Sequence, residues 1–181
     1  VSGSGEYDVK DTGLTIGGGL RHNLQEQSYE YDAFARYKGL DDTLSAEASI
    51  AGNHERLRQL SLSGSYRPNE QDFYSVKYDH DFDSNRQNLD MTAQKRINDF
   101  SIRGRQEFTY GPSNGLSASS ELLGAYHINN DLSLIGGAEY RHDDRGERVL
   151  PKAGVQYKDV PIVITYDPEM ESASVGIVLK F

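Results

Sequence analysis

Apolar and polar residues alternate along most of the chain, in segments of about ten residues that turn-forming residues separate. In the segment 131–141, for example, Leu132, Leu134 and Tyr140 share one face, whereas Glu139 lies on the other. A period of two residues predicts β-strands. No segment keeps the period of 3.6 residues that a helix requires.

The alternation predicts about twelve strands, so the fold class is all-β. The predicted strands cover residues 12–22, 29–38, 43–52, 57–67, 72–82, 88–97, 100–110, 116–126, 131–141, 147–158, 160–167 and 171–181. Their connections are short, which predicts hairpins between neighbours and an antiparallel up-and-down sheet. We interpret residues 1–11, which are rich in Gly and Ser, as an N-terminal tail or lead-in to a domain of residues 12–181.

Aromatic residues gather at both ends of the predicted strands, on the apolar face. Tyr37 and Tyr126 lie near one end, Tyr29 and Tyr110 lie near the other, and aliphatic residues, Gly and Ala fill the band between. Two such girdles are typical of a bilayer with two interfaces. The pattern therefore predicts a closed antiparallel transmembrane β-barrel. A soluble lipocalin-like barrel with its apolar face inward is the alternative.

The last predicted strand has an apolar face that ends on an aromatic residue. Val175, Ile177, Leu179 and Phe181 carry this face. The segment resembles the closing strand of Gram-negative outer-membrane barrels, whose assembly machinery reads a terminal aromatic behind alternating apolar positions. We expect these residues to be the assembly signal, and we expect the strand to close the barrel against residues 14–20.

Composition narrows the functional classes. The net charge of −9 disfavours a general nucleic-acid binder, and the absence of Cys rules out a disulfide framework. The mean hydropathy of −0.69 is compatible with a barrel, because only alternate residues of a membrane strand face lipid. The five His residues show no zinc-ligand spacing, so we expect no metal and no cofactor.

The polar face of the predicted strands carries many charges, which would line the lumen of a barrel. The predicted pore-lining residues are Arg21, Arg36, Glu47, Lys77, Arg96, Arg103, Arg105, Glu107, Glu121, Glu139, Arg141 and Lys152. Two interpretations stay open. The charges could border a water-filled path, or they could pair across neighbouring strands and close the lumen.

Hydrolytic chemistry is a further alternative, since His80, Ser84 and Asn85 lie close together in sequence and His142 precedes an acidic pair. His80, however, has the parity of the apolar face. Triads are recognised by geometry rather than by proximity in sequence, so we expect no enzyme activity.

The strand pattern, the aromatic girdles and the terminal segment make the chain resemble small Gram-negative outer-membrane β-barrel proteins. In strand number it is similar to monomeric twelve-stranded porins for acidic oligosaccharides. That resemblance implies a basic track, to which Arg21, Arg36, Arg96, Arg103, Arg105 and Arg141 would correspond. The interspersed acidic residues depart from such a track, and the loops here are shorter.

The sequence thus predicts an outer-membrane channel for passive diffusion of small hydrophilic or charged solutes. Its expected partners are outer-membrane lipid, lipopolysaccharide and the barrel-assembly machinery. A periplasmic or surface protein is a further candidate partner. The functional alternative is a non-conducting barrel that acts as an anchor, a secretion component or a surface-recognition element.

Overall fold

The described residues form one β-sheet of thirteen strands and contain no helix. The computed structural model describes residues 2–25, 27–39, 41–112, 115–144, 146–158 and 160–177. The strands are β1 (Ser2–Val9), β2 (Leu14–Asn23), β3 (Ser28–Lys38), β4 (Leu44–Asn53), β5 (Leu57–Tyr66), β6 (Phe73–Asp81), β7 (Arg86–Ile97), β8 (Phe100–Gly111), β9 (Gly115–His127), β10 (Leu132–Asp143), β11 (Gly146–Tyr157), β12 (Val160–Asp167) and β13 (Ser172–Ile177).

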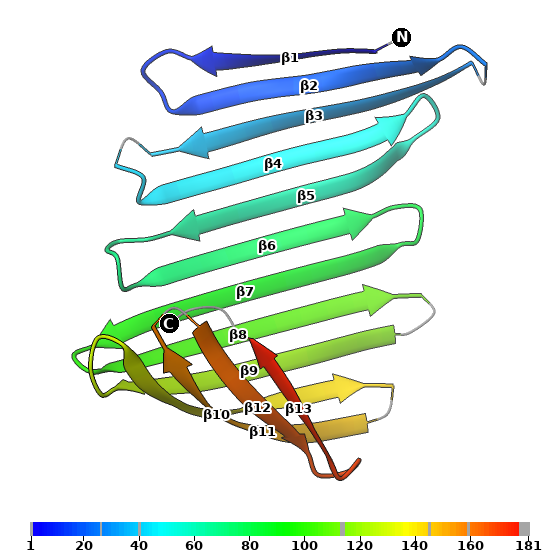
Figure 1. Ribbon diagram of the computed structural model, residues 1–181. Helices are drawn as coiled ribbons and strands as arrows, with labels where there is room; N and C mark the ends of the chain where they lie inside the picture. Colours follow the sequence, from blue (N-terminus) through cyan, green and yellow to red (C-terminus); the bar gives the residue numbers. More distant parts are fainter. Residues whose placement is uncertain are drawn as a thin grey trace.

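The strand order in the sheet is the order in the sequence, and every neighbouring pair is antiparallel (Figure 1). The predicted all-β, up-and-down topology is therefore confirmed, and each predicted strand corresponds to one of β2 to β13. Ser2–Val9, within the Gly- and Ser-rich residues 1–11, forms β1, a strand that the sequence did not predict. This additional strand raises the count from about twelve to thirteen. The division between residues 1–11 and a domain of residues 12–181 stays a prediction.

Turn residues in the left-handed region allow the tight connections. Asp42, Asn98 and Lys158 have φ values of 60°, 55° and 53° in the compact turns along one edge of the sheet. Asn85, with φ of 50°, lies in a charged connection at the opposite edge. Asn and Asp tolerate this conformation better than most residues, so their positions agree with the turns read from the sequence.

The sheet is unevenly curved. Figure 1 shows β1 to β7 as a gently twisted layer, while β10 to β13 bend across β8 and β9. Inside this bend, Leu123 and Ala125 of β9 pack with Ile135 of β10 and Val163 of β12. The C-terminal third of the sheet thus encloses a small apolar cluster, and the N-terminal strands remain open.

The two ends of the sheet do not pair with each other in the part of the chain that the structure describes. β1 pairs with β2, and β13 pairs with β12. β2 carries β1 on one edge and β3 on the other, so the expected pairing of the last strand with residues 14–20 is not formed. Closure into a barrel stays a prediction. Leu179 and Phe181 of the predicted assembly signal lie outside the described residues.

The sheet has an apolar face that is exposed and a polar face that is partly enclosed. The face that carries Leu122, Leu134 and Val149 is called the outer face here, and all three side chains are exposed. The opposite, inner face carries Arg103 and Glu139, which are only 4% and 7% exposed. This distribution is the reverse of the usual one, in which charged residues are almost never fully buried.

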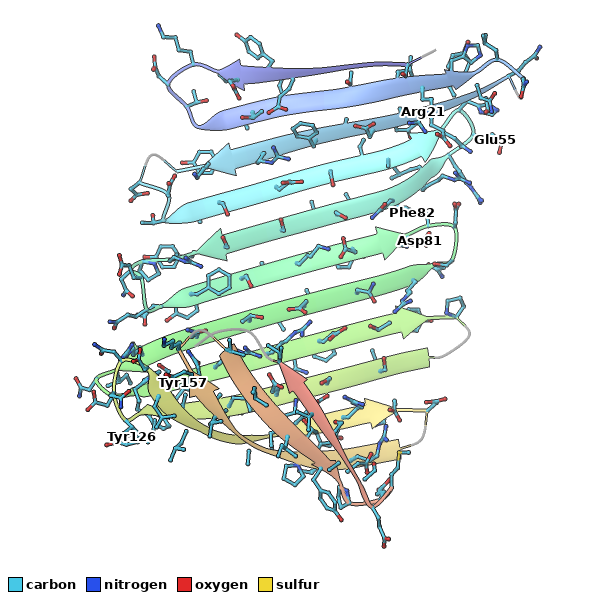
Figure 2. All side chains as sticks on the ribbon, in the orientation of Figure 1. Arg21, Glu55, Asp81, Phe82, Tyr126 and Tyr157 are labelled. Carbon is cyan, nitrogen blue, oxygen red and sulfur yellow. The ribbon has the colours of Figure 1, made fainter. Side chains whose placement is uncertain are left out.

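Exposed aromatic side chains mark both strand-end edges of the outer face, as the sequence predicts. One row follows the compact turns and the other follows the charged connections. Figure 2 shows Tyr126 and Tyr157 at the first edge and Phe82 at the second. The first row is Tyr37, Tyr66, Phe100, Tyr126 and Tyr157, and the second is Tyr29, Phe82, Tyr110, Tyr140 and Tyr166.

Two inner-face glycines permit the tight bend. A Cβ atom at Gly137 would lie 2.1 Å from the carbonyl oxygen of Leu122, and one at Gly154 would lie 2.1 Å from that of Ile162. Real Cβ atoms do not approach a backbone oxygen so closely. Glycine within a strand commonly marks a bend or a close backbone approach, and here it lets neighbouring strands curl toward the inner face.

Gly136 and Gly137 offer a matched test of this role. We expect Gly137→Ala to lower the free energy of unfolding by about 1–3 kcal/mol, because the new methyl group overlaps the β9 backbone. Gly136→Ala places its methyl group on the outer face, where nothing lies within 4 Å, so it should stay within about 0.5 kcal/mol of the parent. Chemical unfolding followed by circular dichroism measures both, and equal effects would contradict the assignment.

Candidate functional site

The strand register places every predicted pore-lining residue on the inner face. Directly opposed residues of neighbouring strands share a face, as Arg36 does with Glu47 and Arg105 with Glu121. Following the pairs from strand to strand connects the whole set. Its members are Arg21, Arg36, Glu47, Lys77, Arg96, Arg103, Arg105, Glu107, Glu121, Glu139, Arg141 and Lys152.

Five of these residues form an ionic cluster across four strands inside the bend. We define it as Arg103 of β8, Glu121 of β9, Glu139 and Arg141 of β10, and Lys152 of β11. Arg103 Nη2 lies 2.8 Å from Glu121 Oε1, and Lys152 Nζ lies 2.8 Å from Glu139 Oε2 while also contacting Glu121. Arg141 Nη2 lies 2.6 Å from Glu139 Oε1.

The register explains why this cluster needs its lysine. Glu121 and Glu139 oppose each other directly on β9 and β10, an arrangement in which like charges repel. Gly137, the next inner position on β10, lies opposite Lys152 and has no side chain. The Lys152 ammonium can therefore reach both carboxylates. Ser119 adds a hydrogen bond by donating its hydroxyl to Glu139 Oε1 at 2.9 Å.

Charges outside the cluster are paired in the same way but are more exposed. Arg105 donates from Nε to Asp90 Oδ2 at 2.9 Å, and its Nη2 lies 3.4 Å from Glu107. Arg36 Nε lies 2.9 Å from Glu47 Oε2. The cross-strand pairing that the sequence left as one of two interpretations is thus present on the inner face.

A second buried arginine was not among the predicted site residues. Arg148 of β11 contacts Asp143, and its Nη1 lies 3.5 Å from Asp167 Oδ2. Asp143 and Asp167 end β10 and β12, so the three residues join neighbouring strands at the edge with the charged connections. The sequence did show that Arg148 has inner-face parity, but it could not show which carboxylates reach it.

Sequence reasoning also missed a hydrogen-bonded chain of two serines and a histidine. His127 Nε2 lies 2.7 Å from Ser101 Oγ, and His127 Nδ1 lies 2.7 Å from Ser133 Oγ. Ser101 and Ser133 are buried, at 1% and 4% exposure. The sequence offered one signal for this contact. By the alternation of faces, His127 lies on the inner face, as do the two serines on the neighbouring strands. The arrangement ties β8, β9 and β10 together near the compact turns.

The histidines considered for hydrolysis have other contacts. His80 stacks on Phe82 with ring centroids 4.1 Å apart, on the outer face as its parity predicts. Ser84 donates its backbone N–H to Asp81 at 3.2 Å, which forms a turn. His142 Nδ1 lies 3.7 Å from Glu147.

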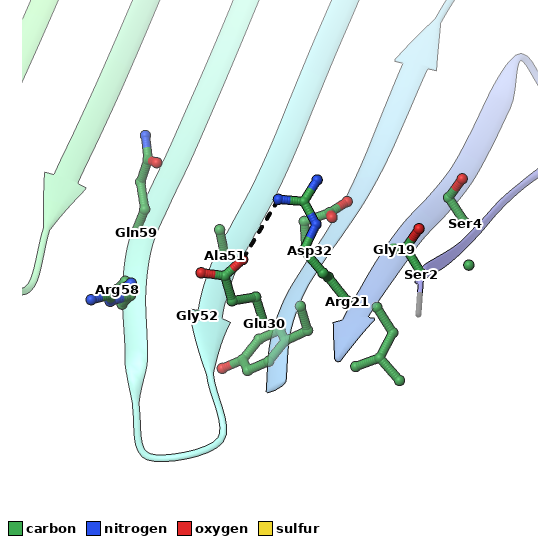
Figure 3. Close-up of a pocket in the computed structure, with 13 residues that line it drawn as sticks. Ser2, Ser4, Gly19, Arg21, Glu30, Asp32, Ala51, Gly52, Arg58 and Gln59 are labelled. Atoms are coloured by element: carbon green, nitrogen blue, oxygen red, sulfur yellow. Dashed lines mark ion pairs between the residues drawn. The ribbon is translucent and has the colours of Figure 1, made fainter. Parts of the chain in front are cut away.

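Two of the hollows on the inner face have a volume of about 590 Å³ each. One borders the ionic cluster and extends from β8 to the end of β13 at Ile177. The other lies over β1 to β5. There Arg21 Nη1 and Glu30 Oε2 point toward each other at 3.9 Å (Figure 3). Both hollows are bordered by charged side chains, so either suits hydrated polar molecules.

The compact turn between β3 and β4 is set by a carboxylate. Asp41 accepts hydrogen bonds from the Thr43 hydroxyl at 2.8 Å and from the Thr43 backbone N–H at 3.2 Å. These bonds favour the charged carboxylate and hold the pKa of Asp41 below its usual value.

Neither a metal site nor a helical membrane span emerges from the described ranges. They contain no group of three or more His, Asp or Glu residues placed to hold a metal ion. They also contain no helix long and apolar enough to cross a bilayer.

No protein-family model matches the chain, and no curated protein matches it. The functional argument therefore depends on the fold and on the distribution of charge over its two faces.

The ionic cluster predicts a large difference between two lysines. Lys152→Met removes the cation shared by two buried carboxylates, and we expect it to lower the free energy of unfolding by about 3–5 kcal/mol. Lys38→Met breaks an exposed pair with Asp42, whose atoms are 2.9 Å apart, and should cost less than about 1 kcal/mol. Chemical unfolding of both variants tests this. A small effect at Lys152 would show that the cluster contributes little to the fold.

Proposed function

We propose that the chain forms a closed transmembrane β-barrel in the outer membrane of a Gram-negative bacterium and acts there as a passive channel for small hydrophilic or charged solutes. The observation that carries this proposal is the reversed polarity of the sheet. Large apolar side chains cover the exposed outer face, and charged residues occupy the enclosed inner face.

In water this arrangement would be unfavourable. Burial of apolar surface contributes about 25 cal/mol per Å², and monomeric soluble proteins rarely expose large contiguous apolar patches. Here Leu122, Leu134, Val155 and Ile164 are all exposed on the outer face. A soluble lipocalin-like barrel would enclose such residues and place Arg103 outside, so the polarity disfavours that alternative.

Strand length and edge composition fit a bilayer as well. A transmembrane strand needs about 9–11 residues. β2, β4 and β5 have 10 residues, β3 has 11, and β7 to β11 have 12 or 13. The aromatic rows lie at the two edges, where interfaces would be. In a bilayer, lipid surrounds the sheet, and unpaired backbone groups at a sheet edge are costly there. A sheet in this setting therefore closes into a barrel.

The uneven size of the inner-face side chains supports a channel path. Serines occupy most inner positions of β4 and β5, where Ser45 opposes Ser65 and Ser49 opposes Ser61. Arginine, lysine and glutamate are concentrated on the inner face of β8 to β11, beside the buried apolar residues Leu123, Ile135 and Leu150. In a closed barrel of this size, side chains alone would not fill the lumen. The path would run along the serine-rich inner face of β4 and β5, which we call the serine sector, and the ionic cluster would lie on the facing wall.

A non-conducting barrel that serves as an anchor, secretion component or surface-recognition element is the second candidate. The pairing of the inner charges favours it, since Arg103, Glu121, Glu139 and Lys152 fill part of the interior and neutralise one another. Conductance in a planar bilayer separates the two candidates.

The proposed setting implies further partners. Lipid and lipopolysaccharide would contact the outer face. The barrel-assembly machinery would read the terminal strand, where Val175 and Ile177 are 71% and 75% exposed. The channel would carry small hydrophilic solutes, and a periplasmic or surface protein could join it. The proposal includes no nucleic acid, no cofactor and no catalytic step.

The serine sector predicts a channel variant with a close control. Ser63→Trp places a large ring between Glu47 and Lys77 on the inner face, so we expect a lower single-channel conductance. Leu62→Trp places the same ring on the outer face and should leave conductance unchanged. Absence of conductance in the parent would refute the channel and favour the non-conducting barrel.

The outer face predicts how the protein responds to an added charge in lipid. Leu122→Arg puts a cation at the middle of β9 on the outer face, and we expect it to cost about 2–4 kcal/mol in a bilayer. Glu70→Arg, in the exposed β5–β6 turn, should stay within about 0.5 kcal/mol of the parent. Reversible unfolding in phospholipid vesicles measures both. Equal, small effects would indicate that water covers the outer face.

A further inference from the structure

The number of strands leaves the two ends of the sheet mismatched. Every neighbouring pair is antiparallel, so β1 and β13, the two edge strands of the described sheet, run in the same direction. Pairing them would create a parallel seam. Bacterial single-chain barrels have an even number of antiparallel strands. β2 runs opposite to β13, so a seam between these two strands would be antiparallel and would close twelve strands.

β1 is a weak partner for the edge of β2 that it occupies. On the outer face its positions opposite Leu20 and Gly18 are Gly3 and Gly5. A Cβ atom at either glycine would meet nothing within 4 Å, and Leu20 remains 53% exposed. Glycine within a strand has no side chain to pack and weakens the pairing.

β13 carries apolar side chains along its outer face, whereas β1 carries them only in its second half, where Tyr7 and Val9 oppose Ile16 and Leu14. The outer positions of β13 include Ala173 and Val175, and Val175 is 71% exposed and so available to cover the outer face of β2. Its inner positions are Ser172, Ser174 and Gly176. These small residues suit the inner positions of β2, which include Gly17 and Gly19.

β2 is also held in place without β1. The Lys38 N–H of β3 donates to the Gly13 carbonyl at 2.8 Å, just before β2 begins. A Cβ at Gly13 would lie 2.0 Å from the Lys38 carbonyl oxygen, and its φ of 71° suits glycine. Gly13 thus anchors the start of β2 to β3, and the turn at residues 10–12 can act as the hinge of β1.

We propose that the edge of β2 is the docking site of β13, and that β1 is an exchangeable strand that occupies this edge until the barrel closes. The exchange releases Ser2–Val9 from the wall and leaves β2 to β13 as an antiparallel barrel. This inference depends on the proposed membrane barrel. It keeps the seam between the last strand and residues 14–20 that the sequence predicts, and it adds that β1 holds this edge beforehand and is not part of the closed wall.

Disulfide trapping tests the exchange, because the chain contains no Cys that would interfere. Arg21→Cys serves as a common anchor on the inner face of β2. Its partner is Ser2→Cys, which opposes Arg21 in β1, or in separate variants Ser172→Cys, Ser174→Cys or Gly176→Cys in β13. After insertion into outer-membrane vesicles and oxidation, we expect a cross-link from Arg21→Cys to at least one β13 position and none to Ser2→Cys. A cross-link to Ser2→Cys alone, or none to the three β13 positions, would overturn the inference.

Proline pairs give a second readout that does not depend on register. Gly5→Pro with Glu6→Pro breaks the β1 ladder, and Ala48→Pro with Ser49→Pro breaks that of the central strand β4. We expect the first variant to keep the heat-modifiable gel mobility of a closed barrel and the second to lose it. Loss of that mobility in both variants would assign β1 to the wall. A parent that lacks it would instead refute the membrane barrel itself.

Discussion

The structure depends on one continuous register of antiparallel backbone hydrogen bonds from β1 to β13. Because side chains alternate between the two faces, a slip of one residue would exchange the faces of every following strand. Arg103 and Glu121 would then lie on the apolar face and Leu122 on the charged face. The register shift between Ala51 and Gly52 occurs near the end of β4, where few residues of that strand follow it. Short turns fix the register between neighbouring strands.

Within that register, the charged residues of the inner face are placed so that two facing glutamates share one lysine. Two glutamates oppose each other on β9 and β10, and a lysine from β11 reaches both because the residue opposite it is Gly137. The same glycine permits the close approach of β9. One position therefore allows both the curvature of the sheet and the contact that makes two facing carboxylates compatible. Arg103 and Arg141 contact the two carboxylates from the two sides, so the cluster has three positive and two negative charges.

Much of the fold could be predicted from the sequence because alternation is a local property. The strands β2 to β13, the aromatic edges and the inner-face residues all follow from it. β1 could not be identified, because Gly3 and Gly5 remove the apolar side chains that would reveal a period of two. The partners of each charge also escaped prediction. Whether Lys152 reaches Glu121 depends on strand curvature and on diagonal neighbours, which the sequence of one strand does not contain. His127 reaches Ser101 diagonally as well, because Ser101 opposes Ala125, whereas Ser133 lies directly opposite His127.

The placement of Gly137 and Gly154, the inner-face glycines of the bend, has a consequence for the shape of the molecule. They lie on β10 and β11, so the tightest bend belongs to one side of the sheet, while β1 to β7 form the gently twisted layer. A tube made from such a wall would have an oval or D-shaped cross-section rather than a circular one. Its widest point would be displaced from the centre toward that layer, and a molecule inside would meet a polar hydroxyl wall on one flank and fixed charges on the other. Such a transverse asymmetry would orient a dipolar solute as it moves along the axis.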